Sequence, residues 1–201
     1  MTSQSDAKFF GGCAILAGVG GFLYAVSFIV LRDPLLYSLC LTLIGLFSSA
    51  ALTGVYSRVR DTNGVVALWA LLLGIAGALG SAAHGAYDLA NAINVPASIP
   101  SNIENLPSQI DPRGFLTFGV SGVALFLFAW FVARSGEFPK TLAYLGYLSA
   151  ALSIVLYVGR LIILSTTNPI ILVPALLNGF IVNPLWFIWL GVLLTRGKAK
   201  A

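Results

Sequence analysis

The chain has 201 residues, of which 58% are hydrophobic and only 9% carry a charge. Soluble domains contain about 25% charged residues, and a soluble fold could not hide this much apolar surface from water. The composition therefore excludes a soluble globular protein, so the surrounding solvent must be a lipid bilayer. At about 20 apolar residues per crossing, the chain has room for about five to seven membrane helices and for no sizeable domain outside the membrane.

The few reactive side chains limit the cofactors that the chain could bind. Its one histidine, His84, excludes haem held by two histidines and zinc sites built from several histidines. The two cysteines, Cys13 and Cys40, are too few for an iron–sulfur cluster and lack the CxxC spacing. We therefore expect no cofactor, with a pigment bound through His84 as an alternative.

Hydropathy between charged residues and prolines predicts six transmembrane helices in a single domain. The expected helices cover residues 9–31, 35–57, 64–92, 114–133, 141–164 and 170–195. The short connections make consecutive helices antiparallel neighbours. The long connection, 93–113, contains four prolines, and we expect it to pack over the bundle as an ordered lid because apolar residues recur along it. The predicted fold class is an all-α, polytopic membrane helical bundle.

The distribution of Lys and Arg predicts which way the helices run. With the N-terminus in the cytoplasm, eight of the 11 basic residues fall on the inner side and three, Arg32, Arg113 and Arg160, on the outer side. This positive-inside bias predicts that both termini are cytoplasmic in a multi-pass protein of the cell (inner) membrane. Because the net charge of +4 comes from one membrane face, we expect lipid and other membrane subunits as partners and no nucleic acid.

Small residues recur along the third predicted helix. One stripe repeats every four residues, and a second stripe lies beside it. Together the two stripes comprise Ala70, Gly74, Ala78, Ala82, Ala86, Ala90, Gly77, Ser81 and Gly85. Packing between small residues drives helix association in lipid, so we expect this helix to lie at the centre of the bundle.

The third helix also carries a polar face in the outer third of the membrane. His84, Asp88 and Asn91 follow at spacings of four and three residues, which puts them on one side of the helix. Ionisable groups at this depth cost several kcal/mol unless they are paired. The fifth helix offers Tyr157 and Arg160 on a polar stripe of its own, so we expect an Asp88–Arg160 ion pair.

Two more polar residues, Ser121 on the fourth helix and Asn178 on the sixth, are expected at a similar depth. The candidate site therefore comprises His84, Asp88, Asn91, Ser121, Tyr157, Arg160 and Asn178. Two interpretations stay open. The cluster either pins the helices together, as polar residues in membrane bundles often do, or lines an outward-facing pocket or ion path, because intramembrane ionisable residues mark such sites.

The segment Gly119-Val120-Ser121-Gly122 matches the GxSG pattern of rhomboid intramembrane proteases. His84 and Asp88 would complete a Ser/His/Asp set if the three side chains converged. Rhomboids place the histidine after the serine, whereas here the only histidine precedes it. We therefore expect no enzymatic activity and keep an intramembrane hydrolase as a remote alternative.

Three parts of the sequence share a further likeness. They are residues 84–91, the segment Asp111-Pro112-Arg113-Gly114, and the stretch from Leu142 to Trp186. These segments resemble small bacterial six-helix integral membrane proteins of unknown activity. The resemblance implies a bacterial origin and a six-helix fold, and it supplies no catalytic residue.

Together these features predict a non-enzymatic integral membrane protein. We expect either an accessory subunit of a larger assembly or a binder of a lipid, a pigment or another small hydrophobic ligand in an outward-facing polar pocket. The main alternative is a small transporter or ion pathway that uses His84, Asp88 and Arg160. A transporter needs a continuous polar path, and the inner part of this path meets Tyr147 and Leu145 without a charge. That pattern favours a pocket with a closed inner end.

Overall fold

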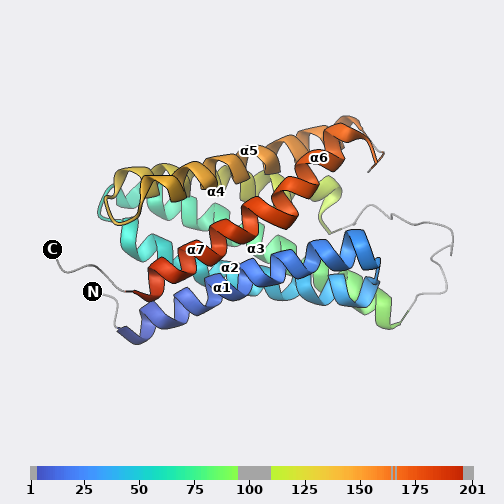
Figure 1. The fold of residues 1–201 in the computed structure, drawn as a ribbon, viewed down its shortest axis with the longest axis horizontal. Coiled ribbons are helices and arrows are strands. Elements are labelled where there is room, and N and C mark those ends of the chain that lie inside the picture. Colours follow the sequence, from blue (N-terminus) through green and yellow to red (C-terminus); the bar gives the residue numbers. More distant parts are fainter. Residues whose placement is uncertain (1–3, 95–109, 164, 166, 197–201) are drawn as a thin grey trace.

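The helices of the computed structural model lie side by side along one long axis (Figure 1). The structure describes residues 4–94, 110–163, 165 and 167–196, and every regular element among these residues is a helix. In chain order the elements are α1 (Gln4–Ala25), η1 (Val26–Leu31), α2 (Pro34–Val59), α3 (Gly64–Ile93), η2 (Pro112–Gly114), η3 (Phe115–Val120), α4 (Ser121–Arg134), α5 (Lys140–Ile162), α6 (Pro169–Leu177), η4 (Asn178–Val182) and α7 (Asn183–Thr195). The short element η2 is a 3-10 turn, whereas η1, η3 and η4 are π-helical turns that continue the adjoining α-helices.

Among the described residues, six helical spans are long and apolar enough to cross a membrane, as in a multi-pass membrane protein. The spans are Gln4–Leu31, Pro34–Val59, Gly64–Ile93, Pro112–Arg134, Lys140–Ile162 and Pro169–Thr195. The predicted helical class and number of spans are thereby confirmed, and the predicted ends differ by a few residues. The predicted lid falls largely on residues 95–109, which lie outside the described residues.

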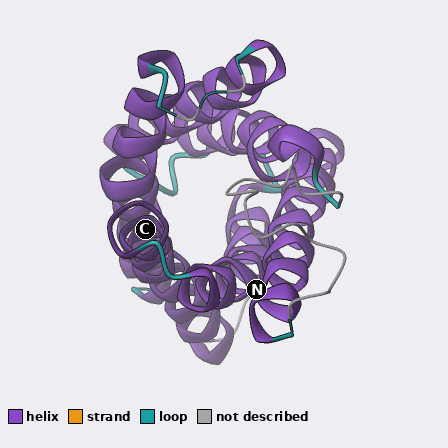
Figure 2. Ribbon diagram, turned by 90° about the vertical axis from the view of Figure 1, so that its right-hand side faces the viewer, coloured by secondary structure: helices purple, strands orange, loops and turns teal. Residues whose placement is uncertain are grey.

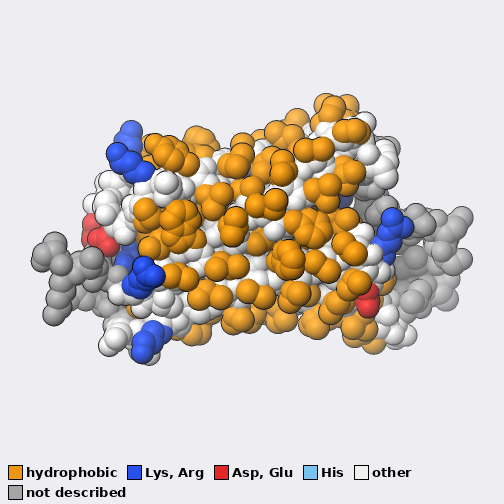
Figure 3. All heavy atoms as spheres, in the orientation of Figure 1, with side chains coloured by type: hydrophobic (Ala, Val, Ile, Leu, Met, Phe, Trp, Pro, Cys, Tyr) orange, Lys and Arg blue, Asp and Glu red, His pale blue; other side chains and the backbone are white. Residues whose placement is uncertain are grey.

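The surface of the bundle carries a broad apolar belt. On the face that Figure 3 draws, hydrophobic side chains cover the middle of the molecule, and charged side chains gather towards its two ends. Leu16, Leu46, Leu72 and Phe126 are each at least 50% exposed. Soluble proteins rarely leave such a continuous apolar surface in water, so the belt is suited to contact with acyl chains.

Side-chain caps fix where two of the spans begin. The carboxylate of Asp33 accepts hydrogen bonds from the backbone N–H groups of Leu35 and Leu36 at 3.0 and 3.1 Å. Asn168 accepts one from the N–H of Ile170 at 3.0 Å. A proline directly follows each cap, at a position where its missing N–H leaves no helical bond unmade. The polar separators between the hydrophobic runs are therefore also helix start signals.

Seen along its length, the bundle is a ring of helices (Figure 2). Each span packs against the next in chain order, and α7 closes the ring against α1. The predicted central position of the third helix is wrong, because α3 packs between α2 on one side and η3 and α4 on the other. Its outward side chains Leu72 and Leu79 are exposed. Short antiparallel connections place each span beside its sequence neighbours, and a closed ring of such neighbours leaves no span in the middle.

Small residues bring α2 and α3 into close contact. A Cβ atom at Gly45 would overlap the backbone of Ala78 and Ala82, and a Cβ atom at Gly85 would lie 2.5 Å from the backbone nitrogen of Thr42. The stripe of small residues therefore does what such stripes do in lipid, which is to let two helix backbones approach without intervening side chains.

Apolar side chains fill one half of the ring. We call the end at which α1 begins and α7 ends the terminal end, and the opposite end, where α3 ends and η2 begins, the loop end (Figure 1). The bulkiest of the fully buried side chains belong to α4, α5 and α7, towards the terminal end. They are Trp186, Phe128, Phe131, Leu142 and Leu190.

A buried arginine fastens the terminal end. The guanidinium of Arg58, only 4% exposed, donates from Nη2 to the carbonyl oxygen of Leu194 at 3.0 Å, and its Nη1 lies 3.9 Å from Oε2 of Glu137. A positive charge is favourable at the C-terminal end of a helix such as α7. These contacts join the end of α2 to α7 and to the α4–α5 connection. We refer to Arg58 with these two contacts as the Arg58 clamp, which holds the terminal end of the ring together.

We expect Gly45→Val to lower the free energy of unfolding by about 1–3 kcal/mol more than Gly12→Val, because the added side chain would push α2 away from α3. Gly12 is the matched control, since nothing lies within 4 Å of a Cβ atom built there. Unfolding followed by circular dichroism in detergent measures both variants. Equal stabilities would contradict the close α2–α3 contact.

Candidate functional site

The loop-end half of the ring holds charged side chains around His84. His84 and Asp88 lie one turn apart on α3, with Nε2 of His84 3.3 Å from Oδ2 of Asp88. On its other side, Nδ1 of His84 lies 3.9 Å from Oδ2 of Asp111, which directly precedes η2. The imidazole therefore stands between two carboxylates from different parts of the chain. We refer to His84, Asp88 and Asp111 as the histidine cluster.

Asp111 is a buried carboxylate, with 1% of the residue exposed. Its Oδ1 accepts a hydrogen bond from the backbone N–H of Leu116 at 2.7 Å, and its Oδ2 accepts one from the N–H of Thr117 at 3.0 Å. A left-handed turn at Arg113 (φ 60°) and Gly114 (φ 76°) brings the carboxylate back over the start of η3. Unpaired N–H groups give a helix start partial positive charge, which stabilises the buried anion.

Asp111 stays ionised because several neighbours donate hydrogen bonds to it. Burial alone would raise the pKa of this carboxyl group, but the nearby His84 imidazole, 3.9 Å away, and hydrogen bonds from the Thr117 side chain and from the backbone N–H groups of Leu116 and Thr117 lower the pKa to about 2. These donors favour the charged form more strongly than burial disfavours it. A fixed negative charge therefore faces His84 at any physiological pH.

Arg160 lies at the same end of the ring on α5. Its guanidinium carbon is 5.7 Å from the centroid of the Phe118 ring, and its Nη1 is 3.3 Å from the point that a Cβ atom at Gly114 would occupy. The predicted Asp88–Arg160 ion pair is wrong: within the described part of the chain no carboxylate lies within 4.0 Å of Arg160, and Asp88 instead contacts His84. Arg160 interacts with Asp111 over a longer range.

Two tyrosines complete this region from α1 and α2. The rings of Tyr24 and Tyr37 meet edge to face with their centroids 6.4 Å apart. Both lie within electrostatic range of Asp88, and Tyr24 is also within range of Arg160. Polar groups therefore converge in the loop-end half of the ring. They come from α1, α2, α3, α5 and the turn before η3.

Ser121 is not joined to His84. Its hydroxyl group donates to the carbonyl oxygen of Leu116 at 3.1 Å, within the same span. Both imidazole nitrogens of His84 instead face carboxylates. Nucleophilic catalysis needs the serine and its base within hydrogen-bond reach, so Ser121, His84 and Asp88 do not form a Ser/His/Asp triad here.

Asn178 belongs to a separate polar network. Its Oδ1 accepts from the Ser149 hydroxyl at 2.8 Å, and its Nδ2 donates to the Ser153 hydroxyl oxygen at 3.0 Å. Nδ2 of Asn183 also donates to the Ser149 oxygen, at 3.3 Å. These bonds join α5 to η4 and α7 and satisfy the polar groups that make them. The network is suited to holding two helices together.

Tyr157 and Asn91 lie outside the histidine cluster as well. The Tyr157 ring packs on Gly119, where a Cβ atom would come within 3.0 Å of it, and its centroid is 5.6 Å from that of Phe115. Asn91 is half-buried on α3, one turn beyond Asp88. Of the predicted site residues, the structure thus brings His84, Asp88 and Arg160 to one region.

Sequence reasoning missed Asp111 as a site residue. An aspartate before Pro112 and a hydrophobic run has the pattern of a helix N-cap, and that signal was available. Nothing in the local pattern, however, places a residue beside His84, which stands 27 positions earlier in the sequence. Within the described residues, no group of three or more His, Cys, Asp or Glu side chains is arranged to hold a metal ion.

No protein-family model, curated protein or solved structure matches this chain. The resemblance to small bacterial six-helix membrane proteins therefore stays a prediction.

We expect Asp111→Asn to lower the free energy of unfolding at about pH 7 by about 1–3 kcal/mol, because it leaves a buried N–H group of η3 without its charged acceptor. The folded-state pKa of about 2 lies below the ordinary value of 3.8. The ionised group therefore contributes its stability above pH 3.8, and this contribution is lost as the pH falls through about 2. The stability difference between wild type and variant should stay constant from about pH 7 to pH 5 and shrink below about pH 4.

Asp61→Asn is the control for this series, since the Asp61 side chain is 81% exposed and its loss should leave stability unchanged. Chemical unfolding at a series of pH values measures all three proteins. If Asp111→Asn behaves like Asp61→Asn, the Asp111 carboxylate does not stabilise the start of the fourth span.

Proposed function

We propose that this chain is a non-enzymatic multi-pass membrane protein that binds the anionic group of a small amphiphilic molecule at the loop end of its helical ring. The observation that carries this proposal is Arg160, a guanidinium in the polar half of the ring with no carboxylate within 4.0 Å among the described residues. The bound molecule is a lipid or another small amphiphile, and this binding is compatible with a role as an accessory subunit.

An unpaired arginine inside a membrane protein is costly unless an anion or water meets it. Its planar fork of five donors matches carboxylate and phosphate groups in a bidentate fashion. The nearby carboxylates are engaged elsewhere: Asp88 contacts His84, and Asp111 accepts the N–H groups of Leu116 and Thr117. Arg160 therefore supports recognition of an external anion.

The filled terminal half supports a binding pocket over a conduit. Phe128, Phe131 and Trp186 occupy that half with no exposed surface, and Arg58 holds α2 to α7 beneath them. A transporter or ion pathway through His84, Asp88 and Arg160 stays the second proposal. It would require these large side chains and the Arg58 clamp to move.

The test compares ligands that differ only in charge. We expect octanoate and octyl phosphate to raise the melting temperature of the purified protein in nanodiscs, and octanol, with the same chain and no charge, to leave it unchanged. At a hundredfold excess over its dissociation constant, a ligand stabilises the folded state by about 2.7 kcal/mol. The shift should disappear in Arg160→Gln and weaken in Arg160→Lys, which keeps the charge without the fork.

Arg32→Gln is the matched control, because Arg32 is an exposed basic residue at the end of η1, and this variant should keep the full shift. Equal shifts with octanoate and octanol, or a full shift in a folded Arg160→Gln variant, would contradict the anion site. Flux of a permeant anion across proteoliposomes that contain the protein would support the transport proposal instead.

We also propose that both chain ends face the cytoplasm, since Arg58, Arg134, Lys140 and Arg196 all lie near the terminal end of their spans. A membrane-impermeant maleimide added to intact cells should label Ser165→Cys at the loop end and leave Asp61→Cys at the terminal end unlabelled. Both positions are exposed, and the native Cys13 and Cys40 are buried. The reverse labelling pattern would overturn this orientation.

A further inference from the structure

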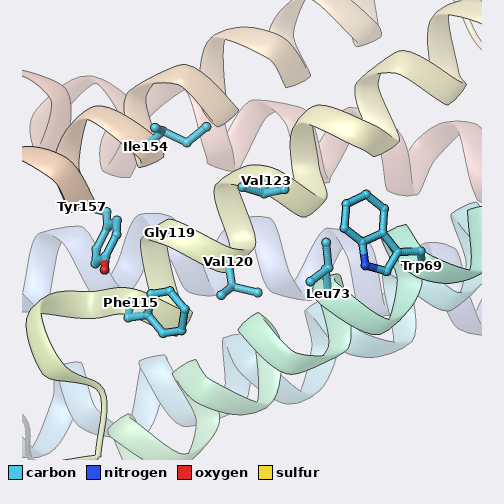
Figure 4. A pocket seen from close by; sticks show the side chains of 8 residues that line it. All are labelled: Trp69, Leu73, Phe115, Gly119, Val120, Val123, Ile154 and Tyr157. Atoms are coloured by element: carbon cyan, nitrogen blue, oxygen red, sulfur yellow. The ribbon is translucent and has the colours of Figure 1, made fainter. Parts of the chain in front are cut away.

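A groove lies between the third, fourth and fifth spans, and none of the residues that line it belongs to the histidine cluster (Figure 4). Its volume is about 320 Å³, within the range of ligand-binding pockets. The residues that line it come from α3, η3, α4 and α5. They are Trp69, Leu73, Phe115, Gly119, Val120, Val123, Ile154 and Tyr157.

The π-helical turn η3 and one glycine shape this groove. Along η3 the widened turn of a π-helix replaces the regular α-helical spacing. At Gly119 the absent side chain lets the Tyr157 ring come close to the backbone, since a Cβ atom there would lie 3.0 Å from the ring. The ring of Phe115 meets Tyr157 at one end of the groove, and Trp69 lies at the other (Figure 4).

The groove opens towards the bilayer. Phe115, Val123 and Trp69 are 48%, 42% and 52% exposed, within spans that carry the apolar belt. From Phe115 to Val123 the chain rises by at most about 12 Å, the value for a regular α-helix at 1.5 Å per residue, because the π-helical turn η3 rises less. That length is close to the roughly 15 Å of hydrocarbon in one leaflet, half of the about 30 Å core. The surroundings and the length both fit an acyl chain.

The loop end of the groove lies near a basic residue. Arg113 stands two residues before Phe115, and it lies close enough to Arg160 for the two positive charges to oppose each other. The nearest acidic residue in sequence, Asp111, is buried and accepts the N–H groups at the start of η3. A negative headgroup beside Arg113 would complement this basic residue.

We propose that this groove is a binding site for one acyl chain of an anionic phospholipid, whose headgroup lies beside Arg113. This site goes beyond the amphiphile site at Arg160 and opens on the outside of the ring. It is tested through residues that the Arg160 experiment does not change.

The experiment uses the full chain in nanodiscs with phosphatidylglycerol that carries a diazirine in its acyl chain. Photolysis should attach the lipid to the groove residues of η3, α4 and α5, as mapped by mass spectrometry of peptides. Val123→Trp fills the groove and should reduce this labelling by about ten-fold. Val19→Trp on α1 is the matched control, since Val19 and Val123 are both 42% exposed, and it should label like wild type.

The headgroup is tested with Arg113→Gln. Wild type should prefer labelled phosphatidylglycerol to labelled phosphatidylcholine, and the variant should label equally with both. Unchanged labelling of the groove in Val123→Trp, or labelling spread evenly around the belt, would overturn the acyl-chain site. A partner protein helix crosslinked into the groove in place of lipid would overturn it too. Equal labelling of wild type by both lipids would overturn the anionic headgroup.

Discussion

The buried carboxylate of Asp111 connects the parts of the loop end. It accepts the first free N–H groups of η3 at Leu116 and Thr117, and its Oδ2 faces the imidazole of His84 at 3.9 Å. The Asp111 side chain therefore stabilises the start of the fourth span. Through His84 it also holds that span against α3. The left-handed turn that ends at Gly114 also leaves the space in which Nη1 of Arg160 lies. Without this anion, the contact that joins His84 on α3 to the start of η3 would be lost.

The sequence predicts the parts of this fold that depend on neighbouring residues. Hydropathy gives the six spans, and Asp33 and Asn168 mark two helix starts, because both signals act over a few positions. The order of helices around the ring is a global property, so the small-residue stripe of α3 indicates close packing without revealing that α3 lies in the wall. The same limit explains the Asp88–Arg160 error. Helix phase turns both residues inwards, but His84 stands one turn from Asp88 on the same helix and reaches it first.

The two halves of the ring divide structural and chemical roles. Towards the terminal end, large aromatic side chains pack without exposed surface and resist any opening, because vacating such a core costs several kcal/mol per side chain. Towards the loop end, the interior instead contains polar groups, namely Ser81, Thr117 and the histidine cluster. The Asn178 network lies between the halves and joins α5 to the last span. A membrane protein that only needed stability would gain more from extending the apolar core than from burying charges.

The π-helical turns follow the same division. Within the described residues they occur at the end of the first span, at the start of the fourth and near the middle of the sixth, and none lies close to the terminal end. A π-helical turn weakens regular helix geometry and is frequent at functional sites. Here η3 donates two of its N–H groups to Asp111 and forms one wall of the groove, while η4 brings Asn178 to Ser149 and Ser153. Regular helices build the closed half of this ring, and distorted ones shape the half that carries its polar chemistry.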